Sequence, residues 1–300
     1  MRVFLTGATG FIGSHIVPEL IAAGHDVLGL ARSDARARAL VAAGASVHRG
    51  DLEDPDTLRA GARDADAVIH AAFDHDFSNF AANCDKDRRA IEALGAALAG
   101  SDRPLVITSG VGIGASEPGR PATEDAFDAN HPTPRVASEL AGRAMLDAGV
   151  NVSVVRLPQV HDTRKQGLIT PYIELARTKG SVAYVGQGRN RWSAAHVSDV
   201  AKLYRLAVEA GRAGARYHAV GEEGVAARDI AEAVAEGLGL PVVSLSPDEA
   251  KAHFGWLAMF VGLDLAASSA LTRETLDWRP TGPGLIEDLE AMDYSSAAAA

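Results

Sequence analysis

Residues 6–13 read Thr-Gly-Ala-Thr-Gly-Phe-Ile-Gly, between an apolar run at 2–6 and a helical pattern at 12–23. Gly7 permits a tight turn after a strand, Gly10 leaves room for a pyrophosphate, and Gly13 allows the helix to pack closely on the strand. The free N–H groups at the start of the helix attract phosphate oxygens. The stretch therefore predicts a dinucleotide-binding turn. Other residues of this turn expected to contact the dinucleotide are Thr9, Phe11 and Ile12.

Short apolar runs alternate with longer helical patterns through the first half of the chain, which is typical of strands buried on both faces of a sheet. This alternation predicts an α/β fold, a Rossmann-type doubly wound parallel sheet with a smaller C-terminal substrate lobe. The strands are expected at 2–6, 26–31, 46–49, 67–71, 105–109 and 152–157. The helices are expected near 12–23, 35–43, 56–62, 79–99 and 134–148.

After residue 157 the alternation weakens, and the segments 158–195 and 241–270 look richer in loops. We therefore expect residues 1–157 to form the dinucleotide-binding domain and residues 158–300 to form mainly a substrate lobe. Segments near 197–220 are expected to return to the Rossmann sheet. Ligands of open α/β sheets bind at the carboxyl ends of the strands, so the lobe should cover that edge.

The second expected strand ends in Leu-Ala-Arg-Ser at 30–33, where an acidic residue would bind the ribose 2′-hydroxyl of NAD. Arg32 and Ser33 instead offer a guanidinium and a hydroxyl to a 2′-phosphate, which favours NADP. The alternative is an exposed surface arginine, because Asp34 weakens the local positive potential. Further contacts are expected at the ends of the third, fourth and sixth strands, from Asp51, Leu52, Ala71, Ala72 and Pro158. Asp51 is equally consistent with a helix cap.

The composition excludes several classes of protein. A net charge of −10 without a dense basic run argues against a nucleic-acid partner and favours solubility. The single cysteine, Cys84, permits no disulfide within the chain, and no apolar run has the length of a membrane span. We expect a cytoplasmic protein. No spaced pair of metal ligands is present among the histidines, so no metal is predicted.

Together these motifs resemble the extended short-chain dehydrogenase/reductase superfamily, of the NAD-dependent epimerase/dehydratase type. The resemblance rests on TGATGFIG at 6–13, GDL at 50–52, HAA at 70–72, ITSG at 107–110 and HVSDVA at 196–201. It implies a homodimer built through helices of the Rossmann half, and a substrate pocket under the C-terminal lobe. Members with ordinary chemistry carry a Ser or Thr after the fifth strand and a Tyr-x-x-x-Lys on the next helix.

Ser109 matches the first of these elements, but Arg135 stands in the place of the tyrosine and Glu139 in the place of the lysine. The chain therefore resembles an atypical branch of the superfamily. Arg135 cannot act as a general acid, although it can stabilise a developing alkoxide or bind a substrate carboxylate. Glu139 lies one turn later, within reach of Arg135, and can accept hydrogen bonds from the nicotinamide ribose. An ordinary ion pair between the two is an equal alternative for Glu139.

A proton donor must then come from elsewhere, and His161 is the first choice because it follows the sixth strand and titrates near neutrality. Tyr172 and Tyr184 are alternatives, and the run Asp74 to Asp76 can line the same pocket.

Three functions remain open from the sequence. The leading hypothesis is an NADP(H)-dependent oxidoreductase, a reductase or dehydrogenase acting on a small carbonyl or related substrate. The second is an epimerase or dehydratase with tightly held NADP, and the third is a non-catalytic dinucleotide-binding regulator. Consumption of NADPH only with added substrate would support the first hypothesis. Activity without net cofactor change would support the second, and binding without turnover the third.

Overall fold

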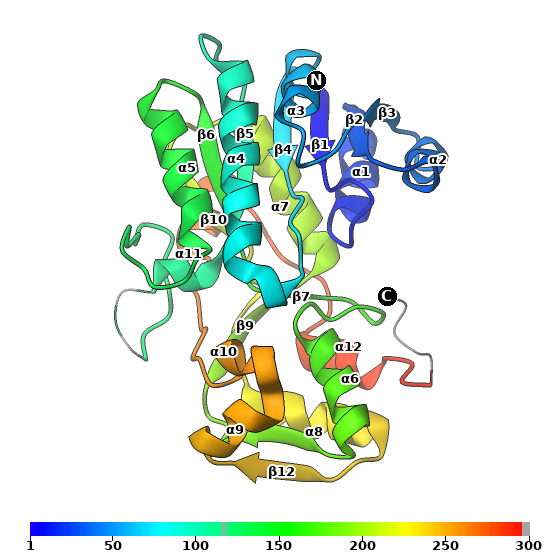
Figure 1. Cartoon of the computed structure of the whole chain (residues 1–300), viewed down its shortest axis with the longest axis vertical. Helices are drawn as coiled ribbons and strands as arrows, with labels where there is room; N and C mark the ends of the chain where they lie inside the picture. Colours follow the sequence, from blue (N-terminus) through cyan, green and yellow to red (C-terminus); the bar gives the residue numbers. More distant parts are fainter. Residues whose placement is uncertain (116, 118, 296–300) are drawn as a thin grey trace.

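The central element of the fold is a seven-stranded sheet in which every pair of neighbours is parallel. The computed structural model describes residues 1–115, 117 and 119–295 (Figure 1). The strand order is β10-β6-β5-β4-β1-β2-β3. The strands are β1 (Arg2–Thr6), β2 (Asp26–Ala31), β3 (Ser46–Arg49), β4 (Ala67–His70), β5 (Leu105–Gly110), β6 (Val152–Leu157) and β10 (Arg216–His218).

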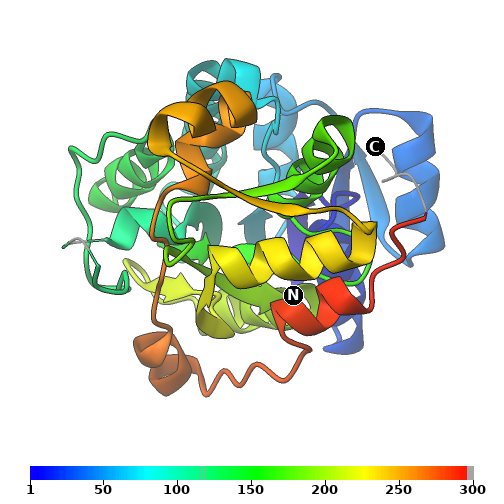
Figure 2. The ribbon, with the colours of Figure 1, turned by 90° about the horizontal axis from the view of Figure 1, so that it is seen from below.

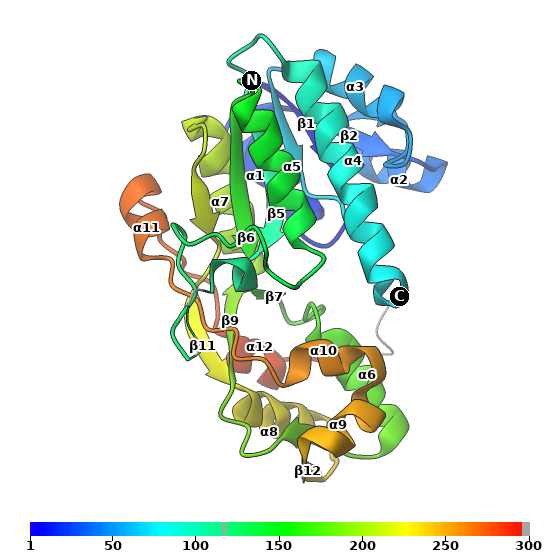
Figure 3. The same ribbon diagram turned by 60° about the vertical axis from the view of Figure 1, so that its left-hand side comes forward.

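Helices cover both faces of this sheet, because successive residues of a strand point to opposite sides. In β1, Val3 and Leu5 face one apolar core, whereas Phe4 faces the other. The first core packs against α1 (Gly13–Ala22), α2 (Asp34–Ala42) and α7 (Val197–Ala210). The second packs against α3 (Pro55–Arg63), α4 (Phe80–Leu98) and α5 (Val136–Asp147) (Figure 3).

This arrangement confirms the predicted fold class and places a ligand-binding edge. The strand order reverses between β1 and β4, which are neighbours in the sheet. At such a reversal the loops after the two strands diverge and leave a crevice at the carboxyl ends, where ligands bind. Segments after residue 157 also contribute to this layer, since α7 packs on the sheet and β10 pairs with β6.

The C-terminal lobe has more regular structure than the sequence suggested. Two small sheets lie in or beside it, with orders β11-β9-β7 and β12-β8. Their strands are β7 (Gln159–His161), β8 (Val182–Val185), β9 (Arg191–His196), β11 (Glu222–Ala226) and β12 (Val242–Leu245). The remaining α-helices are α6 (Ile169–Lys179), α8 (Ala227–Leu238), α9 (Pro247–Phe254), α10 (Ala258–Val261), α11 (Ala270–Leu276) and α12 (Leu285–Glu290) (Figure 2).

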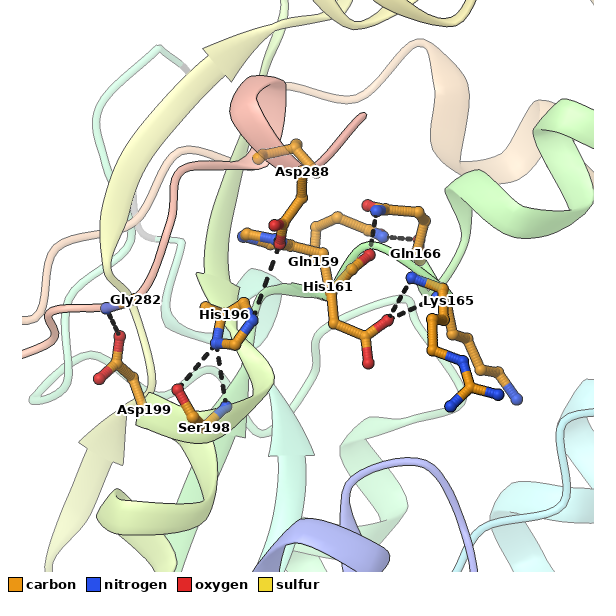
Figure 4. A network of polar contacts seen from close by, with 12 residues as sticks. Gln159, His161, Lys165, Gln166, His196, Ser198, Asp199, Gly282 and Asp288 are labelled. Carbon is orange, nitrogen blue, oxygen red and sulfur yellow. Dashed lines mark hydrogen bonds and ion pairs between the residues drawn. The ribbon is translucent and has the colours of Figure 1, made fainter. Parts of the chain in front are cut away.

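Polar and aromatic contacts fasten the lobe over the carboxyl edge of the main sheet. Asp199, at the start of α7, accepts hydrogen bonds from the backbone N–H groups of Thr281 and Gly282 (Figure 4). The second contact is aromatic: the rings of Phe77 and Trp256 stack with centroids 4.7 Å apart. Phe77 opens the short η1 helix (Phe77–Asn79), just after β4. The lobe therefore closes over the loop that follows β4.

None of the helices in the described residues combines the length and the apolar character needed to cross a bilayer.

Candidate functional site

The turn after β1 has the geometry of a phosphate cradle. Gly7 has a φ of +72°, and a Cβ at this residue would lie 2.8 Å from the backbone of Ala71 and Ala72. A Cβ on Gly13 would lie 2.0 Å from the Gly7 carbonyl oxygen, so both positions require glycine. At Gly10 the only atom of the described residues within 4 Å of an added Cβ is that same oxygen, at 3.1 Å. Gly10 therefore borders open space above the turn.

The backbone of the turn also leaves hydrogen-bond donors free. The N–H of Gly10 donates to the Gly7 carbonyl over 2.8 Å, and that of Ser14 donates to the Gly10 carbonyl. Between them, the N–H groups of Phe11, Ile12 and Gly13 make no hydrogen bond to any described residue. Three adjacent donors at the start of α1 suit a diphosphate. Thr9 lies at the top of the same turn and is half-buried.

Lys165, which the sequence reading missed, lies over this turn. Its ammonium nitrogen is 5.9 Å from the centroid of the Phe11 ring. The loop after β7 holds it there, because Asp162 accepts the backbone N–H of Lys165 and itself donates its N–H to the Lys165 carbonyl. No motif reveals this placement, because the loop meets the glycine turn only through the tertiary fold.

Arg32 is exposed at the end of β2, beside the turn. Ser33 is the N-cap of α2, where its Oγ accepts the N–H of Arg36. Asp34, expected to weaken the positive potential here, pairs with Arg49 at the end of β3, with an N–O distance of 2.5 Å. Arg49 thus engages Asp34, and the Arg32 guanidinium has no ion-pair partner among the described residues.

The remaining expected cofactor residues lie along the same edge. Asp51 is half-buried just after β3, and its Oδ1 accepts the N–H of Glu53. Leu52 is half-buried against the core on the α3 side. Ala71 and Ala72 touch the glycine turn, as described above. Pro158 is half-buried between β6 and β7.

Arg135, immediately before α5, is held at the carboxyl ends of β4 and β5. One terminal nitrogen donates to Asp87 and Ser138, both at 2.7 Å, and the other donates to the Thr108 carbonyl over 2.8 Å. The guanidinium carbon also lies 4.2 Å from the centroid of the Phe73 ring. Nε and one Nη2 proton have no partner among the described residues, and the side chain keeps 13% of its surface exposed. The guanidinium is thus held in place, and in the described part of the chain two of its N–H groups remain free to donate hydrogen bonds.

Glu139 is paired differently from the sequence expectation. Its carboxylate is buried and accepts two hydrogen bonds from Arg156, at 2.7 and 2.9 Å, and a third from Arg216 at 3.1 Å. Burial raises the pKa of Glu139, but the bonds and charge of Arg156 outweigh it and hold this pKa below its usual value. Glu139 therefore does not contact Arg135, and its two oxygens are occupied by other arginines.

Ser109 lies on the same side of β5 as Glu139 and has 3% of its surface exposed. Its hydroxyl makes no hydrogen bond of usual distance and angle to a described residue, but it is close enough to the Glu139 carboxylate to help lower the pKa of Glu139. The structure thus brings Ser109 to Glu139 and Arg135 to Asp87, in two separate polar groups.

His161 lies in the interior, on β7. Its exposed surface is 0%, its Nδ1 bonds Asp288 of α12 at 2.6 Å, and its Nε2 has no partner among the described residues (Figure 4). Burial lowers the pKa of His161 more than the charge of Asp288 raises it. A neutral, enclosed imidazole that joins β7 to α12 is suited to holding the lobe in place.

His75 is better placed for proton transfer than the two tyrosines. Tyr172 is buried and donates to the Ala183 carbonyl, and Tyr184 lines the same small lobe cavity as Tyr172. His75 is largely exposed and makes an edge contact with Phe73, centroids 5.4 Å apart, on the ring that Arg135 covers.

Two flanking carboxylates of that loop are already engaged. Asp74 pairs with Lys86 at 2.8 Å, and Asp76 caps η1. Within the described part of the chain, no cluster of three or more His, Cys, Asp or Glu residues is arranged to hold a metal ion.

Comparisons with known proteins agree with this geometry. The NAD dependent epimerase/dehydratase family matches residues 3–221. An uncharacterized protein of Schizosaccharomyces pombe is 44% identical over 295 residues, covering 98% of this chain and 100% of that protein. A 4-hydroxy-2-methyl-3-oxo-4-farnesyl-3,4-dihydroquinoline-1-oxide ketoreductase of Stigmatella aurantiaca is 29% identical, covering 72% of this chain and 67% of that protein.

Among solved structures, the dTDP-glucose 4,6-dehydratase of Streptomyces venezuelae with bound NAD has a TM-score of 0.75 at 22% identity. The match covers 97% of this chain and 96% of that one. At this level of identity the likeness shows the shared fold.

Proposed function

The chain belongs to the NAD dependent epimerase/dehydratase family, and we propose that it is an NADP(H)-dependent oxidoreductase that reduces or oxidises a small carbonyl substrate. The observation that carries this proposal is the fixed, partly unpaired guanidinium of Arg135 at the sheet edge that also carries an open glycine turn. The ketoreductase relative supports a carbonyl as the substrate class. The homodimer and the cytoplasmic location expected from the sequence stay predictions.

The residues at the sheet edge fit a nicotinamide dinucleotide. Open space at Gly10 and the unpaired N–H groups of Phe11, Ile12 and Gly13 would hold the pyrophosphate. Lys165, near the Phe11 ring, would add a positive charge. When bound, the dinucleotide supplies or accepts the hydride.

Arg135 acts in this proposal on the carbonyl oxygen. Its free N–H groups would donate to that oxygen, and its permanent charge would stabilise the negative charge that develops during reduction. The charge is fixed before the reaction by Asp87, Ser138 and the Thr108 carbonyl, so little reorganisation is required.

The proton is assigned to His75 in place of His161, because His161 has no exposed surface. Desolvation by the surrounding side chains lowers the pKa of His75, and the charges of Arg135 and Lys165 lower it further. His75 is therefore mostly protonated only at pH values below the ordinary pKa of histidine.

We expect reduction to slow as the pH rises above the lowered pKa of His75, because the imidazolium fraction falls about tenfold per pH unit. His75→Gln should remove this pH dependence and leave NADPH affinity unchanged. The measurement is kcat against pH from 4.5 to 8. His253→Gln is the matched control, because His253 on α9 also has a lowered pKa but lies in the lobe. An unchanged profile in His75→Gln would assign the proton to another group.

We also expect NADPH to bind more tightly than NADH. A charge-assisted contact from Arg32 to the 2′-phosphate contributes about 1.5–3 kcal/mol, roughly 10- to 150-fold in affinity. Arg32→Glu should remove or reverse this preference, whereas Arg38→Glu, the same charge change further along α2, should keep it. Calorimetric titration with both cofactors measures the ratio. Equal affinities in the wild type would refute the preference for NADP.

The direct test of the proposed function is NADPH consumption with a panel of ketones, aldehydes, oxo acids and oxo esters. We expect oxidation of NADPH only when a carbonyl compound is present. Tight NADPH binding without turnover of any compound would instead favour the regulator.

A further inference from the structure

A continuous series of buried and part-buried hydrogen bonds links Arg135 to the glycine turn. Asp87 of α4 contacts Arg135 through Oδ2 at 2.7 Å and the His70 Nε2 through Oδ1 at 3.1 Å. The His70 Nδ1 lies 2.7 Å from the Thr6 hydroxyl, which also accepts the N–H of Ala72 at 3.3 Å. Thr6 is the last residue of β1 and directly precedes Gly7.

Each donor in this series of hydrogen bonds has a matching acceptor. An ionised carboxylate only accepts hydrogen bonds, so His70 donates from Nε2 to Asp87. The Thr6 hydroxyl can then donate to Nδ1 while accepting from Ala72. Three strand or helix elements, β1, β4 and α4, contribute one member each, and all three side chains are at most 1% exposed.

Asp87 and Arg135 form an ion pair that is largely removed from water. Burial raises the pKa of Asp87, but the Arg135 charge and the bonds from His70 and Ser138 outweigh it and hold this pKa at about 2. The carboxylate is thus ionised at neutral pH and balances the guanidinium. Without it, a nearly enclosed cation would remain unpaired, and it would be displaced toward water.

From this geometry we propose that Asp87 and His70 are positioning residues that fix the Arg135 guanidinium at the carboxyl ends of β4 and β5, with Thr6 anchoring His70 to the glycine turn. The role in turnover rests on the proposed function, in which Arg135 contacts the carbonyl oxygen. The positioning itself does not depend on it and can be measured without any ligand.

The first measurement is arginine-detected NMR on the protein without added ligand. A guanidinium held by three acceptors rotates slowly about its C–N bonds, so Arg135 should give separate, exchange-protected Nη signals. Asp87→Asn should merge or broaden them, and His70→Leu should do so partly. Asp85→Asn is the control, because Asp85 lies on the same helix but pairs with Arg88 at the surface. Sharp Arg135 signals in Asp87→Asn would overturn the proposal.

The second measurement is a double-mutant cycle on kcat, with the carbonyl compound that the wild type reduces fastest. Asp87→Asn should lower kcat on the order of 100-fold, the cost of a displacement near 1 Å, with little change in the Kd for NADPH. In the Arg135→Met background the same substitution should cost almost nothing. Losses that multiply in the double variant would overturn the positioning role.

If Asp87→Asn folds poorly, the pairing can be tested through the melting temperature, Tm. Asp87→Asn combined with Arg135→Met removes both charges and should recover much of the lost Tm, whereas an equal loss in both backgrounds would contradict the pairing. If the NMR result holds but no carbonyl is reduced by the wild type, the positioning stands and the proposed function fails.

Discussion

Gly10→Val is expected to abolish measurable NADPH binding while the protein remains folded. Gly10 lies outside the left-handed region, and its added Cβ would meet only the Gly7 carbonyl oxygen, at 3.1 Å, so valine requires a small local shift. The branched side chain would instead fill the space that a pyrophosphate needs above the turn. Fluorescence titration with NADPH measures the loss, and circular dichroism checks the fold.

The matched control for this result is Gly262→Val. Gly262 also lies outside the left-handed region, and an added Cβ there meets no atom within 4 Å, but it lies in the C-terminal lobe. This variant should bind NADPH as the wild type does. Wild-type affinity in Gly10→Val would mean that the glycine turn is not the phosphate site.

Arg135→Met is expected to lower kcat by about 10²- to 10³-fold, the usual cost of removing a donor to a developing oxyanion. The Kd for NADPH should change little, because the pyrophosphate is held by the turn after β1. Arg135→Lys should recover only part of the activity, because lysine keeps the positive charge but lacks the forked N–H donors of arginine. Steady-state kinetics with NADPH and the fastest-reduced carbonyl compound measure both parameters.

Arg143→Met serves as the control for Arg135→Met. Arg143 lies on α5, the helix that Arg135 directly precedes, but it is exposed and pairs with Asp147 at the surface. Its replacement should leave kcat within about twofold of the wild type, as for most surface substitutions. A similar kcat in Arg135→Met and Arg143→Met would remove Arg135 from the reaction.

The main sheet could be predicted from the sequence because its signals are local. Five of the first six strands are short, mainly apolar runs, the exception being Ser46–Arg49, and the predicted boundaries agree with the structure to within one residue, as for 105–109 against Leu105–Gly110. The glycine turn is recognised from the spacing of its three glycines, although the backbone that excludes a Cβ at Gly7 belongs to the distant residues Ala71 and Ala72.

The lobe and the polar networks could not be predicted in this way, because their contacts join distant segments. β8 and β12 pair across some sixty residues, Val182 with Val242, and neither strand has a pattern that identifies the other. Asp87 lies in a charged stretch of α4 that looks solvent-exposed in the sequence, yet it is 1% exposed. Its partner Arg135 is 48 residues away, whereas the ion pair with Glu139, one helical turn on, does not form.

The most direct test of the account follows the hydride itself. The protein is incubated with a carbonyl substrate and NADPH carrying two deuterium atoms at C4 of the nicotinamide, and the product is analysed by mass spectrometry. We expect the wild type to form a product alcohol with one deuterium on the former carbonyl carbon. Arg135→Met should form the same product about 10²- to 10³-fold more slowly. Product without deuterium, or no reduction of any carbonyl compound by protein saturated with NADPH, would contradict the account.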